Sequence, residues 1–261
     1  MTKNEHYWES VAAQWETQRP HGLWRIHADE VNARFLGRWL GTCEDANILK
    51  TDLFDEAFGP GLYTRLFARS EFFAGIDISY HVARIAQSYH EGLTALCADA
   101  RSLPFGDNTF GIVISNSSLD HFRTQDQIVM SLREIYRVLN RPGRLLLTLD
   151  NPVNPIIALR HLLPYRLLHK IGIVPYYVGA SFGPCKLRKV LESAGFKVVK
   201  IDAVLHSPRV IAVLLAHFVE RKAGPDGKKA FLRGLMSFEH LSRLPTRFLT
   251  GYFVAADARK E

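Results

Sequence analysis

Acidic side chains stand at the ends of three apolar runs that favour β-strands. Asp55 follows the first run, Asp77 ends the second and Asp99 follows the third, at intervals of about 20 residues. A carboxylate at a strand end can accept hydrogen bonds from the hydroxyls of a ribose, or from an amine or ammonium group of a ligand. The three acids therefore predict a binding site for a ligand that contains a ribose.

A glycine-containing turn follows the first of these acids and precedes a helix. Gly59 and Gly61 flank Pro60 in this turn, and glycine lets a backbone approach a ligand closely because no Cβ intervenes. Asp52 stands just upstream and is an alternative to Asp55 as the functional acid. We favour Asp55, because its spacing fits the two glycines.

Polar residues that could take part in chemistry follow the fourth apolar run. The strand predicted at residues 111–115 leads into Asn116, and Asp120 and His121 come shortly after it. Histidine is well suited to act as a base near neutral pH. His121 is therefore the candidate general base, and Asp120 is a candidate partner that orients it. A helix cap is the alternative role for Asp120.

Short apolar runs alternate with longer amphipathic stretches between residues 47 and 149, which predicts alternating strands and helices. Such alternation gives right-handed crossovers and a parallel sheet with helices on both faces. Ligands of such a sheet bind beyond the carboxyl ends of the strands, where the polar residues above would gather. The expected strands are 48–54, 72–78, 94–98, 111–115 and 144–149, and the expected helices are 62–69, 81–89 and 125–139.

In order and spacing these features resemble the class I S-adenosylmethionine-dependent methyltransferases, especially the small-molecule branch that includes quinone-biosynthesis enzymes. The resemblance covers residues 47–149 and is most specific from Cys97 to Asn116. It implies S-adenosylmethionine as the cofactor and S-adenosylhomocysteine as the product. It also implies a doubly wound, mostly parallel seven-stranded α/β sheet with an antiparallel last strand.

The resemblance assigns roles to individual residues. Asp55, Gly59 and Gly61 would line the methionine moiety of the cofactor, and Ala57 stands where the family usually has glycine. Asp77 would bind the ribose. The residues expected around the adenine and the sulfonium are Ile78, packed on the adenine, Asp99 and Ala100, at its polar edge, and Asn116, near the sulfonium.

Further segments are predicted around the core at residues 47–150. Residues 1–46 would form two helices, at 7–17 and 26–40, which by resemblance cover the cofactor with Trp8 and Trp15. Residues 151–185 form an insertion. Residues 186–261 would complete the sheet, with a helix at 186–194, strands at 196–205 and 248–256, and an insertion at 206–246 that holds helices at 209–222 and 228–243.

Both insertions leave the sheet at the carboxyl edge of its parallel strands, so we expect them to converge as a cap over the methyl acceptor. Their apolar composition favours a small, apolar or lipid-like acceptor. Residues 210–219 are apolar on nearly all sides, so they are expected to be buried or to wall the pocket. An ordinary second core is the alternative. Tyr176, Tyr177 and His206 are further candidates for the cap.

Charge is distributed unevenly along the chain. Residues 1–155 carry 15 basic and 19 acidic side chains, whereas residues 156–261 carry 18 and 7. The basic amphipathic stretch at 156–171, with Arg160, Arg166 and Lys170, predicts weak contact with an anionic membrane. The alternative is a solvated basic face. No signal-peptide pattern or bilayer-spanning apolar run is present, so we expect a cytoplasmic protein with peripheral membrane contact.

The cysteines and histidines do not form a recognisable metal or disulfide pattern. Cys43, Cys97 and Cys185 lie far apart in the sequence, which argues against a disulfide framework and against a zinc site built on paired cysteines. The histidines are scattered. No metal is expected.

The favoured function is therefore an S-adenosylmethionine-dependent methyltransferase, with the acceptor and its reacting atom undetermined. A nucleic-acid methyltransferase or binder is an alternative, because the second half is basic, although residues 115–118 lack a base-flipping motif. A noncatalytic or repurposed cofactor-binding protein is another, because of Ala57 and the polar strand end at Lys50. A nicotinamide-binding domain is disfavoured, since Thr64 replaces the third glycine of its pattern.

Overall fold

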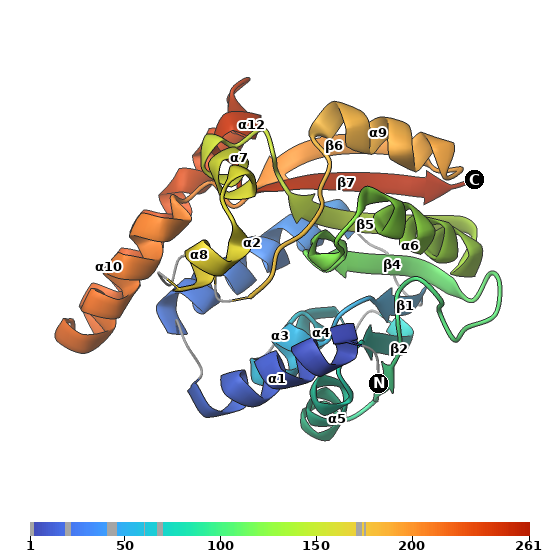
Figure 1. The fold of residues 1–261 in the computed structure, drawn as a ribbon, viewed down its shortest axis with the longest axis horizontal. Helices are drawn as coiled ribbons and strands as arrows, with labels where there is room; N and C mark the ends of the chain where they lie inside the picture. Colours follow the sequence, from blue (N-terminus) through green and yellow to red (C-terminus); the bar gives the residue numbers. More distant parts are fainter. Residues whose placement is uncertain are drawn as a thin grey trace.

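The strands form one sheet with the order β3-β2-β1-β4-β5-β7-β6 (Figure 1). A computed structural model describes residues 3–18, 22–40, 46–59, 61–66, 70–170, 174 and 176–261. The strands are β1 (Ala46–Lys50), β2 (Ser70–Asp77), β3 (Leu93–Cys97), β4 (Phe110–Asn116), β5 (Leu139–Asp150), β6 (Lys197–Val204) and β7 (Phe253–Lys260).

The direction of the strands defines a topological switch point in this sheet. β1 to β5 run parallel, and β7 lies antiparallel between β5 and β6. The chain builds outward from β1 to β3 and then returns to place β4 on the other side of β1. The crevice at the carboxyl ends of β1 and β4 is where ligands of such sheets bind. The predicted doubly wound fold with an antiparallel last strand is confirmed.

Helices cover both faces of the sheet. Neighbouring residues of a strand point to opposite faces, so adjacent apolar residues of one strand pack against different helices. Ile48 and Ile112 face one apolar cluster, and Leu49 and Val113 face the other. The first cluster includes residues of α2 (Gly22–Leu40), α5 (Tyr80–Tyr89), α10 (Arg209–Lys222) and α11 (Pro225–Ser237). The second includes residues of α6 (Gln125–Val138) and α9 (Pro184–Ser193).

The remaining helices are short, apart from the first one. They are α1 (Lys3–Gln18), α3 (Phe54–Phe58), α4 (Tyr63–Leu66), η2 (Leu119–His121), α7 (Pro155–Leu162), α8 (Tyr165–Lys170), η3 (Phe238–Arg243) and α12 (Arg247–Thr250). None of the helices in the described ranges is long and apolar enough to cross a membrane. The division of the chain into core and cap segments stays a prediction.

The bounds of three expected strands differ by several residues from those in the structure, and the strand expected at 144–149 begins at Leu139. The strand expected at 48–54 ends at Lys50, and the chain then turns into the helix α3. The turn forms because the Lys50 side chain is fully buried and pairs with Asp52 and Glu56. The strand expected at 248–256 begins only at Phe253, since residues 247–250 form α12.

Parts of four predictions lie outside the described residues. They concern Cys43, Pro60, the end of the helix expected at 62–69, and residue 171 at the end of the basic stretch. The described part of that helix is α4, which ends at Leu66.

The segment at 210–219 is not buried as predicted. It lies in α10, which packs on α2 through the small residues Ala212 and Ala216. Its larger side chains are exposed, including Leu214 at 67% and Phe218 at 64%. The small side chains face α2 and let the two helices approach closely, whereas the larger apolar side chains named above lie on the opposite, exposed side of α10.

Arg160 does not contribute to a basic membrane face, contrary to the prediction. Its side chain is only 9% exposed and forms an ion pair with Asp150, which is 3% exposed. It also donates a hydrogen bond to Tyr252 Oη at 2.8 Å. Arg166 and Lys170 are exposed on α8.

Candidate active site

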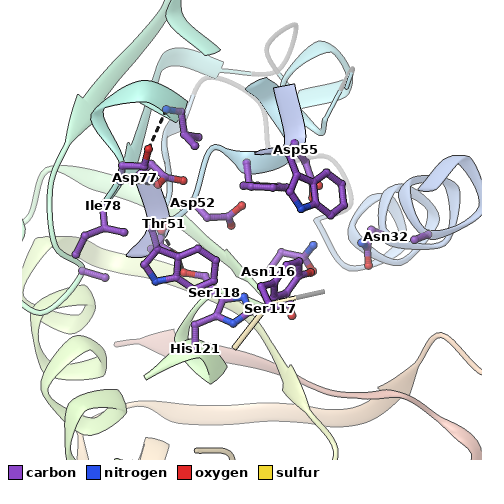
Figure 2. Close-up of a pocket in the computed structure, with 18 of the residues that line it drawn as sticks. Asn32, Thr51, Asp52, Asp55, Asp77, Ile78, Asn116, Ser117, Ser118 and His121 are labelled. Atoms are coloured by element: carbon purple, nitrogen blue, oxygen red, sulfur yellow. Dashed lines mark hydrogen bonds between the residues drawn. The ribbon is translucent and has the colours of Figure 1, made fainter. Parts of the chain in front are cut away.

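One pocket collects the polar residues that follow four parallel strands (Figure 2). Thr51 and Asp52 follow β1, Asp77 and Ile78 stand at the end of β2, and Asn116 ends β4. The loop after β3 adds Asp99 and Ala100. Residues of α1 and α2 also line the pocket, and the prediction that these helices cover the cofactor stays a prediction.

Asp77 is held in place by backbone groups on both sides. Its Oδ1 accepts from Ser79 N at 2.9 Å and its Oδ2 accepts from Leu53 N at 3.1 Å. Burial raises its pKa to about 6, although these two N–H groups and the positive charge of Lys50 favour the ionised form. A carboxylate oxygen has more than one lone pair, so both oxygens can still accept from a ligand.

Asp99 is already engaged by a neighbouring arginine. The Arg101 guanidinium donates to both carboxylate oxygens, with Nε at 3.0 Å from each. Burial raises the pKa of Asp99, but pairing with Arg101 outweighs it and holds the pKa below its ordinary value. Ile78 and Ala100 line the same pocket as Asp99.

The loop after β1 is shaped by a buried ion pair instead of a run of glycines. Lys50 Nζ lies 2.8 Å from Glu56 Oε2 and 2.9 Å from Asp52 Oδ1. Glu56 Oε1 in turn accepts from Leu62 N at 2.9 Å. Burial lowers the pKa of Lys50, but Asp52 and Glu56 raise it more, so the lysine is charged. Gly61 has φ +55°, and a Cβ there would lie 2.5 Å from Glu56 Oε1.

Two buried oxygens beside this loop have no hydrogen-bond partner among the described residues. Asp52 Oδ2 and Asn32 Oδ1 are buried and make no hydrogen bond within the described structure. Burial raises the pKa of Asp52 to about 7 despite its pairing with Lys50. Asp55 instead pairs with Arg25 Nη2 at 2.9 Å. Each acid therefore has one cation as a partner, Lys50 for Asp52 and Arg25 for the favoured candidate Asp55, and Asp52 keeps a buried oxygen, Oδ2, that has no hydrogen-bond partner in the described structure.

Aromatic rings form the wall opposite the strand ends. Tyr176 lies 5.3 Å from His121, 5.9 Å from Trp8 and 6.3 Å from Trp15, measured between ring centroids. Phe54 lies 5.0 Å from Trp15 in an edge-to-face arrangement. All five residues line the pocket, so a flat or apolar ligand would meet rings on several sides.

The hydrogen bonds of His121 fix its tautomer. Its Nδ1 lies 3.0 Å from the carbonyl oxygen of Tyr177. A carbonyl can only accept, so Nδ1 carries the proton and Nε2 keeps a free lone pair in the neutral ring. No hydrogen bond joins His121 to Asp120 in the described structure: the Oδ2 of Asp120 accepts from Ser117 Oγ and from Asp150 N, and its Oδ1 is buried without a partner.

The structure brings most predicted site residues together and separates a few. The pocket is lined by Asp55, Asp77, Ile78, Asp99, Ala100, Asn116 and His121, together with Tyr176. Ala57 and Asp120 are buried away from it. Gly59 and Gly61 shape the adjoining loop without lining the pocket. His206 is a structural residue, because its ring bonds to Thr250 Oγ1 and Ala203 O.

Sequence reasoning missed the contribution of α2. Arg25, Asp29 and Asn32 line the pocket from one face of this helix, as their spacing of four and three residues allows. Burial and the neighbouring Asp55 raise the pKa of Asp29 to about 7. The polar residues on an otherwise apolar helix face were the signal that could have found them.

The sheet order and the position of the pocket are those of a class I S-adenosylmethionine-dependent methyltransferase. Residues 54–147 match the model of a family described as a methyltransferase domain. This part of the chain is therefore similar to a methyltransferase domain, and the predicted resemblance is confirmed.

Individual relatives share parts of the sequence or the fold. The chain is 30% identical over 167 residues to the ubiquinone/menaquinone biosynthesis C-methyltransferase of Hahella chejuensis, covering 58% of this chain and 61% of that protein. A solved S-adenosylmethionine-dependent methyltransferase of Thermotoga maritima has 16% identity and a TM-score of 0.63, with 98% and 99% of the two chains covered. Geranyl diphosphate C-methyltransferase of Streptomyces coelicolor, solved with S-adenosylhomocysteine, has 13% identity and a TM-score of 0.55, with 89% and 80% covered. At these identities the two solved structures are similar in fold alone.

Proposed function

We propose that the protein transfers the methyl group of S-adenosylmethionine to a small, apolar or lipid-like acceptor. The observation that carries this proposal is that the strand-end carboxylate of Asp77 and the aromatic wall around Tyr176 line the same pocket. A carboxylate suits a ribose diol, and the rings suit an apolar molecule. The curated relative from Hahella chejuensis is named for C-methylation in quinone biosynthesis, which fits an acceptor of this kind.

The polar groups of the pocket fit the cofactor when they are assigned one by one. Asp77 would accept from the ribose hydroxyls, Ile78 would pack on the adenine, and the loop at Asp99 and Ala100 would meet the polar edge of the ring. The Oδ2 of Asp52, which has no hydrogen-bond partner in the described structure, would accept from the α-ammonium group, which an anion at the end of β1 attracts.

Residues near the end of β4 would surround the reacting group. When bound, the cofactor supplies an electrophilic methyl group on its sulfonium. Asn116 Oδ1 accepts from Thr148 Oγ1 at 2.8 Å, which orients the amide and leaves its nitrogen for a ligand. The lone pair on His121 Nε2 would take up the proton that the acceptor loses.

The exposed face of α10 supports the further proposal that the acceptor comes from an anionic membrane surface. Val210, Ile211, Leu214, Leu215 and Phe218 form one stripe along the helix, each at least 41% exposed. At 100° per residue these positions fall within one side of the helix. Arg221 and Lys222 follow at its end and are exposed. Apolar side chains with adjacent cations are typical of helices that lie on anionic lipid.

Calorimetry with cofactor-free protein tests the proposed function first. Binding of S-adenosylhomocysteine is expected, and its absence would contradict the proposal. A labelled-methyl assay against fractionated cell extract then tests transfer, with label expected in the organic-soluble fraction. Label confined to nucleic acid would favour the alternative nucleic-acid enzyme, and tight cofactor binding without transfer to any fraction would favour a noncatalytic protein.

A further inference from the structure

Arg209 is a cation on the pocket wall that has no carboxylate partner in the described structure. It stands at the start of α10, beside Leu205 and near Tyr176 and Phe253, and lines the pocket with them. Only one of its guanidinium N–H groups has a protein acceptor there, Tyr252 Oη at 2.8 Å. Arg25, the other arginine of the pocket lining, already has Asp55 as its partner.

The groups behind Arg209 do not neutralise it. Tyr252 Oη accepts a second hydrogen bond, from Arg160 Nη1 at 2.8 Å. Arg160 holds the carboxylate of Asp150. Two guanidinium groups therefore lie against the one phenol of Tyr252, and the carboxylate of Asp150 pairs with Arg160. Burial raises the pKa of Tyr252, although both arginines oppose it, so the phenol is neutral.

The charged guanidinium of Arg209 lies in a pocket with apolar walls, and several of its N–H groups have no acceptor in the described structure. Leaving a partly buried guanidinium without an anion is costly, because water that would solvate it is limited. Its planar fork matches the oxygens of a carboxylate or a phosphate. Tyr252 fixes one edge of the fork by a hydrogen bond, with the guanidinium 5.0 Å above its ring, so the remaining N–H groups have a defined orientation.

We propose that Arg209 binds an anionic group, a carboxylate or a phosphate, on the methyl acceptor. This inference rests on the proposed function, since it places the acceptor in the same pocket as the cofactor. The acceptor is then amphiphilic: its anionic group contacts Arg209, its apolar part contacts the rings around Tyr176, and Tyr252 is a positioning residue for the arginine.

Binding of small aromatic probes in the presence of saturating S-adenosylhomocysteine tests the inference. Benzoate and phenyl phosphate carry the two candidate anions, and benzamide is their neutral match. Calorimetry is expected to show binding of at least one anion and much weaker binding of benzamide. Arg209→Met is expected to raise the dissociation constant of the anion at least about tenfold, the loss of one charged hydrogen bond. Arg209→Lys, which keeps the charge without the fork, is expected to fall between.

Two controls separate the outcomes. Arg166→Met removes an exposed arginine of α8 and is expected to leave probe binding unchanged, and thermal unfolding checks that each variant is folded. Equal binding of benzoate and benzamide, no binding of either anion, or unchanged anion binding by Arg209→Met would overturn the inference. So would a loss of S-adenosylhomocysteine affinity in Arg209→Met, which would assign the arginine to the cofactor carboxylate. Failure of the wild-type protein to bind S-adenosylhomocysteine would instead refute the proposed function.

Discussion

Replacing Asp77 should weaken cofactor binding, because its carboxylate is the group proposed to hold the ribose. Each oxygen of Asp77 already accepts one backbone N–H, from Ser79 or from Leu53. Each can accept one ribose hydroxyl as well, which makes two charge-assisted hydrogen bonds to the ligand. At about 1.5–3 kcal/mol for each bond, Asp77→Ala should cost at least about 3 kcal/mol of binding free energy, or roughly 100-fold in affinity.

The assay is calorimetric titration with S-adenosylhomocysteine, because it does not require the acceptor. Asp77→Asn keeps the shape of the side chain and one oxygen acceptor, so its loss of affinity should be smaller than that of the alanine variant. Asp126→Asn, at an exposed acid in the first turn of α6, is the matched control. A folded Asp77→Ala protein with the wild-type dissociation constant would show that the ribose does not bind here.

The pH dependence of binding gives an independent check on the same carboxylate. Burial raises the pKa of Asp77 to about 6, and only the ionised form accepts from both hydroxyls. Lowering the pH through this value protonates the group, so affinity should fall by up to about tenfold per pH unit below it. The Asp77→Asn protein should lose this component of the pH dependence, whereas the Asp126→Asn protein should keep it.

Three other predictions follow from contacts described above. Lys50→Met should destabilise the fold by about 3–5 kcal/mol, since it leaves the buried carboxylate of Glu56 without its cation. The double variant Lys50→Met with Glu56→Leu should lose less stability than the sum of the two single variants. Additive losses in thermal unfolding would contradict the pairing. His121→Asn should lower turnover by about 100-fold or more without changing the dissociation constant of S-adenosylhomocysteine; unchanged turnover would remove the base. Leu214→Ser with Phe218→Ser should reduce co-sedimentation with anionic vesicles while leaving cofactor binding intact; equal binding of the wild-type protein to neutral and anionic vesicles would mean that this face does not contact anionic lipid.

The parts of the fold that sequence could predict are those set by local patterns. Apolar runs and the turns between them were sufficient to predict a parallel sheet with helices on both faces, because alternating strands and helices give right-handed crossovers. Asp77 and Asn116 could be placed at the pocket for the same reason, since each ends a strand of that sheet. His121 follows a strand end closely enough to share the edge.

The parts that sequence could not predict depend on which polar side chains pair with each other, or on which face of a helix packs against the protein. Lys50 interrupts an apolar run, and nothing local shows that Glu56 and Asp52 neutralise it. Whether Asp52 or Asp55 is open to a ligand depends on the turn into α3, which this ion pair creates. The pattern of α10 shows that it is apolar but not that the small side chain of Ala212 faces the protein.

The buried pair of Lys50 and Glu56 changes what the first loop requires of its sequence. The corresponding loop of the family usually contains glycines that allow its tight turn, whereas here the ion pair between Lys50 and Glu56 stabilises the turn. Ala57 can therefore be tolerated inside it, and glycine is required at Gly61, where Glu56 approaches the backbone. A search for the glycine pattern would miss other chains whose first strand ends in a lysine that pairs with a glutamate six positions later. A search for that charge pair would find them.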